Sequence, residues 1–304
     1  MRTNAQHFHL PVLLQEVIEI FDPKPGKEYI DATVGEGGHA IEIAKRVAPS
    51  GKVLGIDWDP EILERAKERV ASLKLRDVVT LVQGSFAEIG RRAGENGFRE
   101  VNGILFDLGF SSWHIEKSGR GFSFEKEEPL DMRYDPSREG LTAAEVLERF
   151  RGEELERIFR EYGEERFAKR IAREILKARQ VEPSKTTFEL VECVKRSVPR
   201  RFWPKGLNVA TKTFQALRIA VNHEFENLSQ ALPQALELLR NKGALIVISF
   251  HSGEDRIVKK QFQTWQKEGR ATILTKKPIT PSAREAYENP RARSAKLRAS
   301  LRLE

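Results

Sequence analysis

From about residue 27 to residue 112, the hydrophobic residues follow two different spacings, one typical of strands and one typical of helices. Short runs rich in β-forming residues predict four strands, at 29–33, 53–57, 78–86 and 101–109. Between them lie segments in which apolar residues recur every three or four positions, as on one face of a helix. This first third of the chain therefore predicts strands that alternate with helices.

The first two helical segments are the clearest. At 40–48 the apolar residues share one helical face, and the next helix is predicted to start at Asp59, a good N-cap, with Pro60 in its first turn. Strands separated by helices are typical of parallel βαβ units, whose functional sites lie at the carboxyl ends of the strands.

The pattern changes after Ser112. The segment 119–140 has no period and much Gly, Pro and charge, so we expect an ordered loop or lid there. From about 142 to 197 the chain is helical and strongly charged, and then the first pattern returns, with helices across 211–239 and strands at 244–250 and 271–279.

These patterns together predict an α/β fold with a mostly parallel, twisted, Rossmann-like sheet and an inserted helical domain. We expect residues 1–112 and 206–304 to form the sheet domain, and 113–205 to form the insertion as a substrate-binding or lid domain.

The composition of the chain limits which kinds of binding partner and cellular location we expect. The chain has 304 residues and a net charge of +7, which suits a polyanionic partner but is also found in ordinary proteins. The single cysteine, Cys193, excludes a disulfide framework and a cysteine zinc site. Because no apolar run is long enough to span a bilayer, and 1–10 lacks the apolar core of a secretory signal, we expect a cytoplasmic protein without a membrane partner.

A glycine-rich turn follows the first predicted strand. Gly35, Gly37 and Gly38 allow backbone amides to approach a ligand, and the next helix directs its positive end there. Asp57, at the end of the second strand, is placed to accept ribose hydroxyls. A purely structural turn remains the alternative for the glycines alone.

Neighbouring residues favour one cofactor class. Ala40 stands where a dinucleotide fingerprint has its third glycine, and Asp31 would repel a pyrophosphate but suit a cation. Phe86, after the third strand, is a candidate to pack on adenine, although a lone Phe is also a common core residue. We therefore expect S-adenosylmethionine rather than NAD.

Asp107 ends the fourth strand, beside the expected position of the methyl group. A carboxylate there can accept the N–H bonds of an exocyclic amine and localise its lone pair, while alignment supplies much of the remaining rate. Ser111 and Ser112 are candidates to hydrogen-bond a base, or are plain turn residues. The six histidines are scattered, so we expect no metal, and no G-x-S-x-G elbow supports a hydrolase.

Ordered motifs cover nearly the whole chain, and they resemble the bacterial MraW/RsmH family of S-adenosylmethionine-dependent methyltransferases of small-subunit ribosomal RNA. The motifs are HLPVLLQEV at 9–17, GEGGH at 35–39, FDLGFSS at 106–112, RGFSFEKEEPLDMR at 120–133, YGEERFAKRIAR at 162–173, TKTFQALRIAVNHE at 211–224, ISFHSGEDRIVK at 248–259 and ENPRARSAKLR at 288–298.

The resemblance implies N4-methylation of a decoding-centre cytidine of 16S rRNA, cytidine 1402 in the usual rRNA numbering, within the small ribosomal subunit. It also implies cofactor contacts at Gly37, Gly38, His39, Asp57, Phe86, Asp107 and His114. His114 stands where the family usually has glutamine, which puts that contact in question. Milder departures are Ala40, Gly253 and the segment 208–215.

Two basic segments are candidates to hold RNA. In a helix, a stripe would form opposite Phe167, Ile171 and Ile175 from Arg166, Lys169, Arg170, Arg173 and Lys177. An ordinary solvated helix face is the alternative. Arg200, Arg201 and Lys205 surround Phe202 and Trp203, a combination that can clamp a backbone and stack a base, with a structural Trp as the alternative.

The C-terminal third adds two groups. Polar residues that follow the strand 244–250 are expected to face the active-site crevice and orient the base, or to form a buried structural network: His251, Ser252, Glu254, Asp255 and Arg256. The basic tail is a further RNA candidate or a solvated tail, and its arginines are Arg291, Arg293, Arg298 and Arg302.

Other functions stay open at this stage. A methyltransferase of the same fold acting on DNA, another RNA or a protein is one, although FDLGFS lacks the two prolines of the amino-methylating DNA enzymes. An RNA-binding assembly factor with a vestigial cofactor site is another, but Gly37, Gly38 and Asp57 are all present. An NAD-dependent reductase ranks last.

Overall fold

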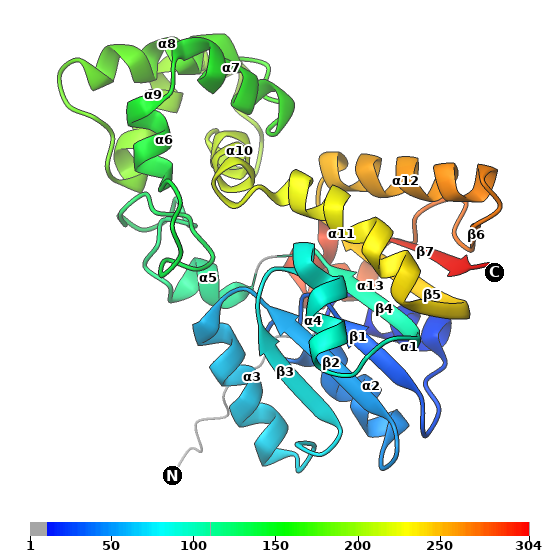
Figure 1. Cartoon of the computed structure of the whole chain (residues 1–304). Coiled ribbons are helices and arrows are strands. Elements are labelled where there is room, and N and C mark those ends of the chain that lie inside the picture. Colours follow the sequence, from blue (N-terminus) through cyan, green and yellow to red (C-terminus); the bar gives the residue numbers. More distant parts are fainter. Residues whose placement is uncertain (1–10, 110, 304) are drawn as a thin grey trace. The chain divides into compact units, whose positions relative to one another are not determined.

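The computed structural model describes residues 11–109 and 111–303, except for the side chain of Ser112. The first two residues of the motif at 9–17 therefore lie outside the described residues. The chain divides into two compact units (Figure 1). Met1–Phe110 with Phe225–Glu304 is the sheet unit, and Ser111–Glu224 is the helical unit.

The sheet unit contains a seven-stranded sheet in the order β3-β2-β1-β4-β5-β7-β6. β1 to β5 run parallel, while β7 pairs antiparallel with β5, and β6 antiparallel with β7. The strands are β1 Glu28–Asp31, β2 Lys52–Asp57, β3 Val79–Gln83, β4 Val101–Asp107, β5 Leu239–Ser249, β6 Ala271–Ile273 and β7 Lys296–Arg302. The predicted α/β fold with a mostly parallel sheet is confirmed.

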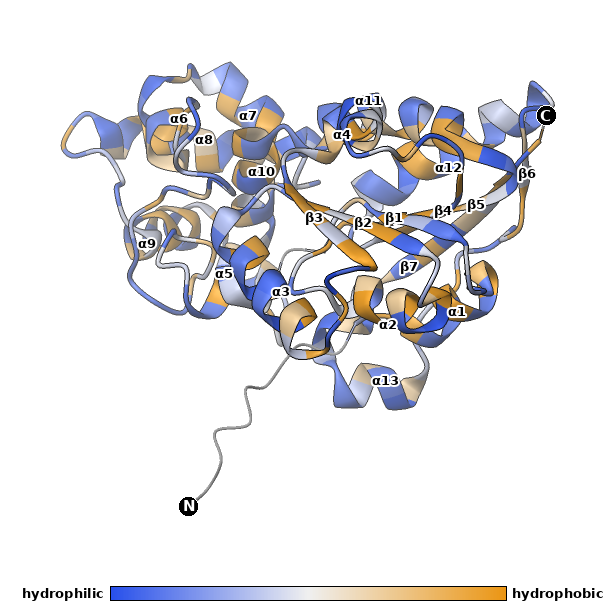
Figure 2. Cartoon of the chain, turned by 60° about the horizontal axis from the view of Figure 1, so that its bottom comes forward, coloured by the Kyte–Doolittle hydropathy of each residue, from blue (hydrophilic) through white to orange (hydrophobic). Residues whose placement is uncertain are grey.

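Helices cover both faces of this sheet (Figure 2). On one face lie α1 (Leu14–Phe21), α2 (Gly38–Val47) and α3 (Pro60–Ser72), and on the other lie α4 (Ile89–Glu95), α11 (Glu224–Leu238) and α12 (Ser252–Lys267). Their apolar stripes form two cores, one around Ile41 and Leu105 and the other around Phe106 and Phe262. The short elements η1 (Phe86–Glu88), α13 (Ala283–Glu288) and η3 (Pro290–Ser294) complete the unit.

The order of the strands fixes where a ligand can bind. β1 lies between β2 and β4, so the chain connections diverge on either side of it and leave a crevice at the carboxyl ends. Asp31 ends β1, Asp57 ends β2 and Asp107 ends β4. Three carboxylates thus gather at the edge where the sequence predicted the cofactor.

The helical unit is built from α5 (Ser112–Glu116), α6 (Ala143–Arg149), α7 (Gly152–Glu161), α8 (Ala168–Arg179), α9 (Thr187–Ser197), η2 (Arg200–Phe202) and α10 (Thr211–Asn222). It has its own core, centred on Phe159, Ile171 and Leu190. The segment 119–140 contains no helix or ladder strand, as predicted, and is held by Arg120, which donates to the carbonyls of Arg133 and Tyr134.

Two expectations need correction. The compact helical unit runs to Glu224 rather than 205, because α10 packs against α6 and α7 and its Phe214 and Leu217 belong to their core. The basic tail is not a solvated tail, because residues 296–302 form β7, in which Leu297 and Ala299 are buried. No helix in the described part of the chain is long and apolar enough to cross a membrane.

Candidate active site

The glycine turn joins β1 to α2 and is fixed by backbone conformation. Gly35 and Gly37 have φ of +52° and +83°, a region that side chains disfavour. A Cβ on Gly38 would lie 2.7 Å from Cγ of Pro11. The Gly35 amide donates to Asp57 Oδ2 at 2.8 Å, so the turn is tied to the end of β2.

Asp57 and Phe86 form one side of the site. The second oxygen of Asp57 accepts from the Asp59 amide at 3.0 Å, and its carbonyl accepts from Gly84 at 2.8 Å, which brings the segment after β3 alongside. The ring of Phe86 packs edge-on against Phe106, with ring centroids 5.8 Å apart, and remains partly exposed. This arrangement suits the predicted contacts of Asp57 with a ribose and of Phe86 with an adenine.

Asp31 and Asp107 form the other side, linked through Thr33. Asp31 is 1% exposed and accepts from the Thr33 amide, while Thr33 Oγ1 accepts from the Asp107 amide at 2.6 Å. The side chain of Asp107 is 20% exposed, yet its Oδ1 is buried and has no hydrogen-bond partner among the described residues. A buried acceptor without a partner is costly, so it indicates a ligand that donates to it.

His39 lies beside Asp107. Its Nε2 is 3.0 Å from the carbonyl of Val12, and because a carbonyl only accepts, Nε2 carries a proton. Its Nδ1 is 3.7 Å from Asp107 Oδ2, which is within ion-pair range but too far for a hydrogen bond. His39 is 4% exposed, so it supports the wall of the site rather than lining it broadly.

The electrostatics of this cluster favour a cation. Burial, followed by the nearby carboxylate of Asp57, raises the pKa of Asp31 to about 7. Burial, followed by Asp31 and then Glu254, raises the pKa of Asp107 to about 8, against the lowering effect of the Gly109 amide. Within the described residues no Lys or Arg forms an ion pair with Asp31 or Asp107. A positively charged ligand would supply the missing partner, which fits a sulfonium and an ammonium group.

Three predicted contacts lie in the helical unit. Ser111 is the N-cap of α5 and its hydroxyl accepts from the Trp113 amide, so it has a turn role. The structure describes the backbone of Ser112 but not its side chain. His114 is 4% exposed and packs against Phe122 and Tyr134. The catalytic roles of the serines and the cofactor contact of His114 stay predictions.

The residues after β5 form a mostly internal network. His251 Nδ1 caps α12 by accepting from the Glu254 amide, and Glu254 Oε2 accepts from the Phe250 amide at 2.9 Å. His251 Nε2 lies 3.1 Å from Glu254 Oε1 without the alignment of a hydrogen bond. Asp255 holds Arg298 through two bonds of 2.6 and 3.2 Å. The geometry favours the structural alternative for Glu254 and Asp255.

Ser252 and Arg256 are exposed on the first two turns of α12, and their substrate role stays a prediction, as does that of His251. In the tail, Arg291 and Arg293 lie in η3, where Arg293 Nε donates to the Ala286 carbonyl at 3.2 Å. The structure thus gives Arg293 a local role and does not test an RNA contact.

In the helical unit, the two predicted basic segments meet. Arg166 lies over the rings of Phe202 and Phe167, at 5.0 and 5.7 Å from their centroids. Arg201 lies 5.0 Å over Phe202, Arg170 lies 5.9 Å over Phe167, and the two rings are 5.3 Å apart. We call these five residues the arginine–aromatic cluster.

The arginines of this cluster have no acidic partner within ion-pair distance in the described part of the chain. Elsewhere in the same unit, arginines pair with glutamates, as the pairs Arg149–Glu145, Arg160–Glu156 and Arg196–Glu174 show. Stacking on a ring orients a guanidinium while its N–H groups stay available to an anion. Lys169, Arg173 and Lys177 are also exposed on α8, opposite the buried Ile171 and Ile175, as the stripe predicted.

Trp203 differs from its neighbour Phe202. Its indole Nε1–H donates to the Val198 carbonyl at 2.9 Å, and its ring packs on the core of the unit. Phe202, the other aromatic of the predicted combination, is 39% exposed. The sequence RRFW does not indicate which aromatic faces solvent, and the turn η2 decides it. The geometry favours a structural role for Trp203 and makes Phe202 the better candidate to contact a base.

Comparisons with known proteins find relatives over nearly the whole chain. The model of the MraW methylase family matches residues 6–303. A ribosomal RNA small subunit methyltransferase H from Pelobacter propionicus is 45% identical, over 97% of this chain and 98% of its own length. A protein of the same name from Syntrophotalea carbinolica is 46% identical with the same coverage. An rRNA methylase structure from Streptococcus thermophilus aligns over 98% of this chain and 100% of its own, with 9% identity and a TM-score of 0.47.

Proposed function

The chain belongs to the MraW methylase family, and from this we propose that it methylates N4 of a decoding-centre cytidine in 16S rRNA of the small ribosomal subunit. It is a methyltransferase whose cofactor is S-adenosylmethionine. An rRNA substrate is supported by relatives at 45% and 46% identity, which are named as small-subunit rRNA methyltransferases. The cytosine and its N4 atom are the finer part of the proposal.

The single observation that carries the proposal of an amine as the acceptor of the methyl group is Asp107 Oδ1, a buried atom that has no hydrogen-bond partner among the described residues. An exocyclic amine is a weak nucleophile, because its lone pair is delocalised into the ring. When Asp107 accepts an N–H bond from that amine, the lone pair is localised on nitrogen. A base that lacks an exocyclic N–H would leave this buried acceptor without a donor.

The cofactor supplies an electrophilic methyl group bound to a positively charged sulfur. Its charge is favoured by Asp31 and Asp107, whose pKa values are raised mainly by burial and which form no ion pair with a Lys or Arg among the described residues. The same positive charge favours the ionised form of Asp107, which is the form that accepts. When bound, the cofactor would give its methyl group to the amine nitrogen, and Asp107 would take the proton that the amine loses.

The arginine–aromatic cluster supports RNA as the substrate. Its guanidiniums are exposed, oriented by stacking and without acidic partners in the described residues, which is the arrangement expected for phosphate contacts. The target base must be unstacked to reach an acceptor as recessed as Asp107 Oδ1.

The test is to incubate the protein with radiolabelled S-adenosylmethionine and small subunits from cells that lack the endogenous enzyme, and then to identify the labelled nucleoside. We expect N4-methylated cytidine at one decoding-centre site. Label in another nucleoside would keep the methyltransferase and contradict the target. Cofactor binding without any label would favour another substrate, or an assembly factor that does not turn over.

A further inference from the structure

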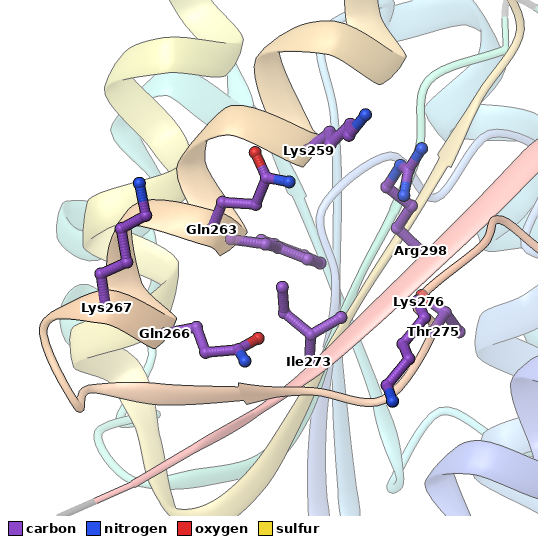
Figure 3. Close-up of a pocket in the computed structure, with 9 residues that line it drawn as sticks. Lys259, Gln263, Gln266, Lys267, Ile273, Thr275, Lys276 and Arg298 are labelled. Carbon is purple, nitrogen blue, oxygen red and sulfur yellow. The ribbon is translucent and has the colours of Figure 1, made fainter.

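A separate cavity lies in the sheet unit, on the side of β6 and β7 (Figure 3). It has a volume of about 600 Å³ and lies between α12 and these two strands. Among the described residues that were considered for RNA or cofactor contacts, the tail residue Arg298 alone lines it. The cavity is within the size range of small-molecule pockets and is far larger than a single phosphate needs.

Its lining is strongly positive. Lys259 and Lys267 come from α12, Lys276 follows β6, and Arg298 comes from β7, while none of the described residues that line the cavity is Asp or Glu. Figure 3 shows these cationic side chains around the cavity, with the amides of Gln263 and Gln266 between them. A cavity with several cations and amide donors suits a phosphate-bearing ligand.

One of these cations is fixed in place. Arg298 is 7% exposed, and Asp255 holds its guanidinium through two hydrogen bonds, so it is oriented before any ligand arrives. Thr275 is 8% exposed and accepts from the Ala299 amide at 2.9 Å, which leaves its hydroxyl hydrogen to donate. The partly exposed Ile273 gives the cavity an apolar part against which a sugar or base can pack, while Phe262, 1% exposed, lines it from the core.

We propose that this pocket binds a backbone phosphate, with its nucleoside, of the RNA that the protein methylates. The inference rests on the proposed function for the identity of its ligand. It adds a second RNA contact, on the sheet unit itself, separate from the arginine–aromatic cluster. A free nucleotide has the same chemistry and is the other source that the experiment distinguishes.

The sheet register favours RNA as the source. Phe106, next to Asp107, pairs with Val247, which pairs with Arg298. Because neighbouring strands are about 4.8 Å apart, the Arg298 backbone lies about 10 Å from that of Phe106. That distance is a few nucleotides along a strand, so an RNA whose target base is near Asp107 can place a neighbouring nucleotide in the pocket.

Adjacent lysines provide a matched test. Lys259 and Lys276 line the pocket, whereas Lys260 and Lys277 are also exposed and do not. The double variants Lys259→Glu/Lys276→Glu and Lys260→Glu/Lys277→Glu have identical composition and net charge. We would measure their affinity for a fluorescein-labelled RNA of the decoding-centre sequence across a range of salt concentrations.

We expect the pocket variant to bind RNA at least tenfold more weakly than its control, with a shallower dependence on salt because phosphate contacts are lost. Both variants should bind S-adenosylhomocysteine as the wild type does, which shows that the sheet unit is folded. Equal RNA affinity of the two double variants would overturn the proposal.

Two further measurements distinguish RNA from a free nucleotide as the ligand, and distinguish a failure of the pocket proposal from a failure of the proposed function. If cytidine 5′-monophosphate binds the wild type and not the pocket variant, while both bind RNA equally, the pocket takes a free nucleotide and the RNA assignment is wrong. RNA affinity is read without turnover. Weaker RNA binding by the pocket variant therefore supports RNA binding in the pocket even if the wild type methylates no cytidine. A lack of cytidine methylation would contradict only the proposed function.

Discussion

The two units treat charge in opposite ways. In the sheet unit, Asp31 and Asp107 are recessed carboxyls that lack cationic partners in the described residues, and their pKa values are raised to about 7 and about 8. In the helical unit, Arg166 and Arg201 are exposed cations that stack on Phe202 and lack acidic partners in the same described residues. In each unit these charged groups lack a partner of opposite charge among the described residues. The expected ligand, a cationic cofactor in the sheet unit and RNA in the helical unit, would supply it.

The difference lies in how each site is built. The carboxyls are held by backbone, at strand ends and a glycine turn, with distances fixed by the sheet. The arginines stack on rings at the surface of a helical core and form no ion pair with the residues that the structure describes. A rigid recessed site suits a small cofactor and a reacting amine, whereas an exposed side-chain site suits a long, variable polyanion. Changes to each site, and to the pH, test this division.

The largest effect should come from Asp107→Asn. The substitution keeps the shape and removes the carboxylate that accepts the amine N–H, so single-turnover methyl transfer should fall by about 10²–10³-fold. Affinity for S-adenosylhomocysteine should stay near that of the wild type, and thermal melting should show a folded protein. Methyl transfer within a few fold of the wild type would remove Asp107 from the reaction.

The double variant Arg166→Ala/Arg201→Ala should weaken RNA binding by at least tenfold and reduce the salt dependence of binding, because two phosphate contacts are lost. Arg149→Ala/Arg160→Ala is the matched control, since both of these arginines are exposed in the same unit but paired with glutamates. Fluorescence anisotropy with labelled RNA measures both. An equal loss in the control pair would mean that only net charge matters.

A smaller effect is expected for the dependence of protein stability on pH. The native pKa values of Asp31 and Asp107 lie above the values of about 4 expected in the unfolded chain, so between pH 4 and 8 the native state retains protons that the unfolded state has lost. These groups therefore make the free protein less stable as pH rises through that range. Denaturant unfolding at pH 5.5 and at pH 8.5 measures the change.

The same carboxyls predict the opposite trend for cofactor binding. A cation binds their ionised forms better, so affinity for S-adenosylmethionine should rise by several fold from pH 6 to 8.5, through the pKa values of about 7 and about 8. S-adenosylhomocysteine, which lacks the sulfonium charge, should change less. Calorimetry of both ligands across this range checks the difference, and equal slopes would place the sulfonium away from these carboxyls.

The smallest effect separates the two neighbouring aromatics. Trp203→Phe removes the hydrogen bond to Val198 and should cost about 1 kcal/mol of stability, with RNA affinity unchanged. Phe202→Leu should leave stability nearly unchanged and weaken RNA binding by a few fold, since an exposed ring is lost. Urea unfolding and anisotropy on both variants decide the assignment, and the reverse pattern would restore Trp203 as the RNA contact.

Local patterns in the sequence are sufficient to predict the cofactor side. Strand ends and glycine turns are set by neighbouring residues, so the run of strands and helices alone places Asp31, Asp57 and Asp107 at one edge of the sheet. The predicted helix start at Asp59 is also confirmed, since its side chain accepts from the amides of Glu61 and Ile62.

The features that the sequence did not predict depend on contacts between residues far apart in the chain. β7 is missed because Arg298 interrupts the apolar pattern, although KLRASLR alternates, and its partner Asp255 lies 43 residues earlier. The boundary near residue 224 depends on how α10 packs, which the helical period alone does not give. The choice between Phe202 and Trp203 depends on a single turn. Local patterns in the sequence do not predict which side chains from distant parts of the chain contact one another.

The division between the two units is tested most directly by steady-state methylation of small ribosomal subunits. Wild type, Asp107→Asn and Arg166→Ala/Arg201→Ala would be compared with labelled S-adenosylmethionine at saturation. We predict that the Asp107 variant loses kcat with little change in the KM for subunits, and that the arginine pair raises this KM with kcat nearly unchanged. A rise in KM for the Asp107 variant together with a loss of kcat for the arginine pair would contradict the account.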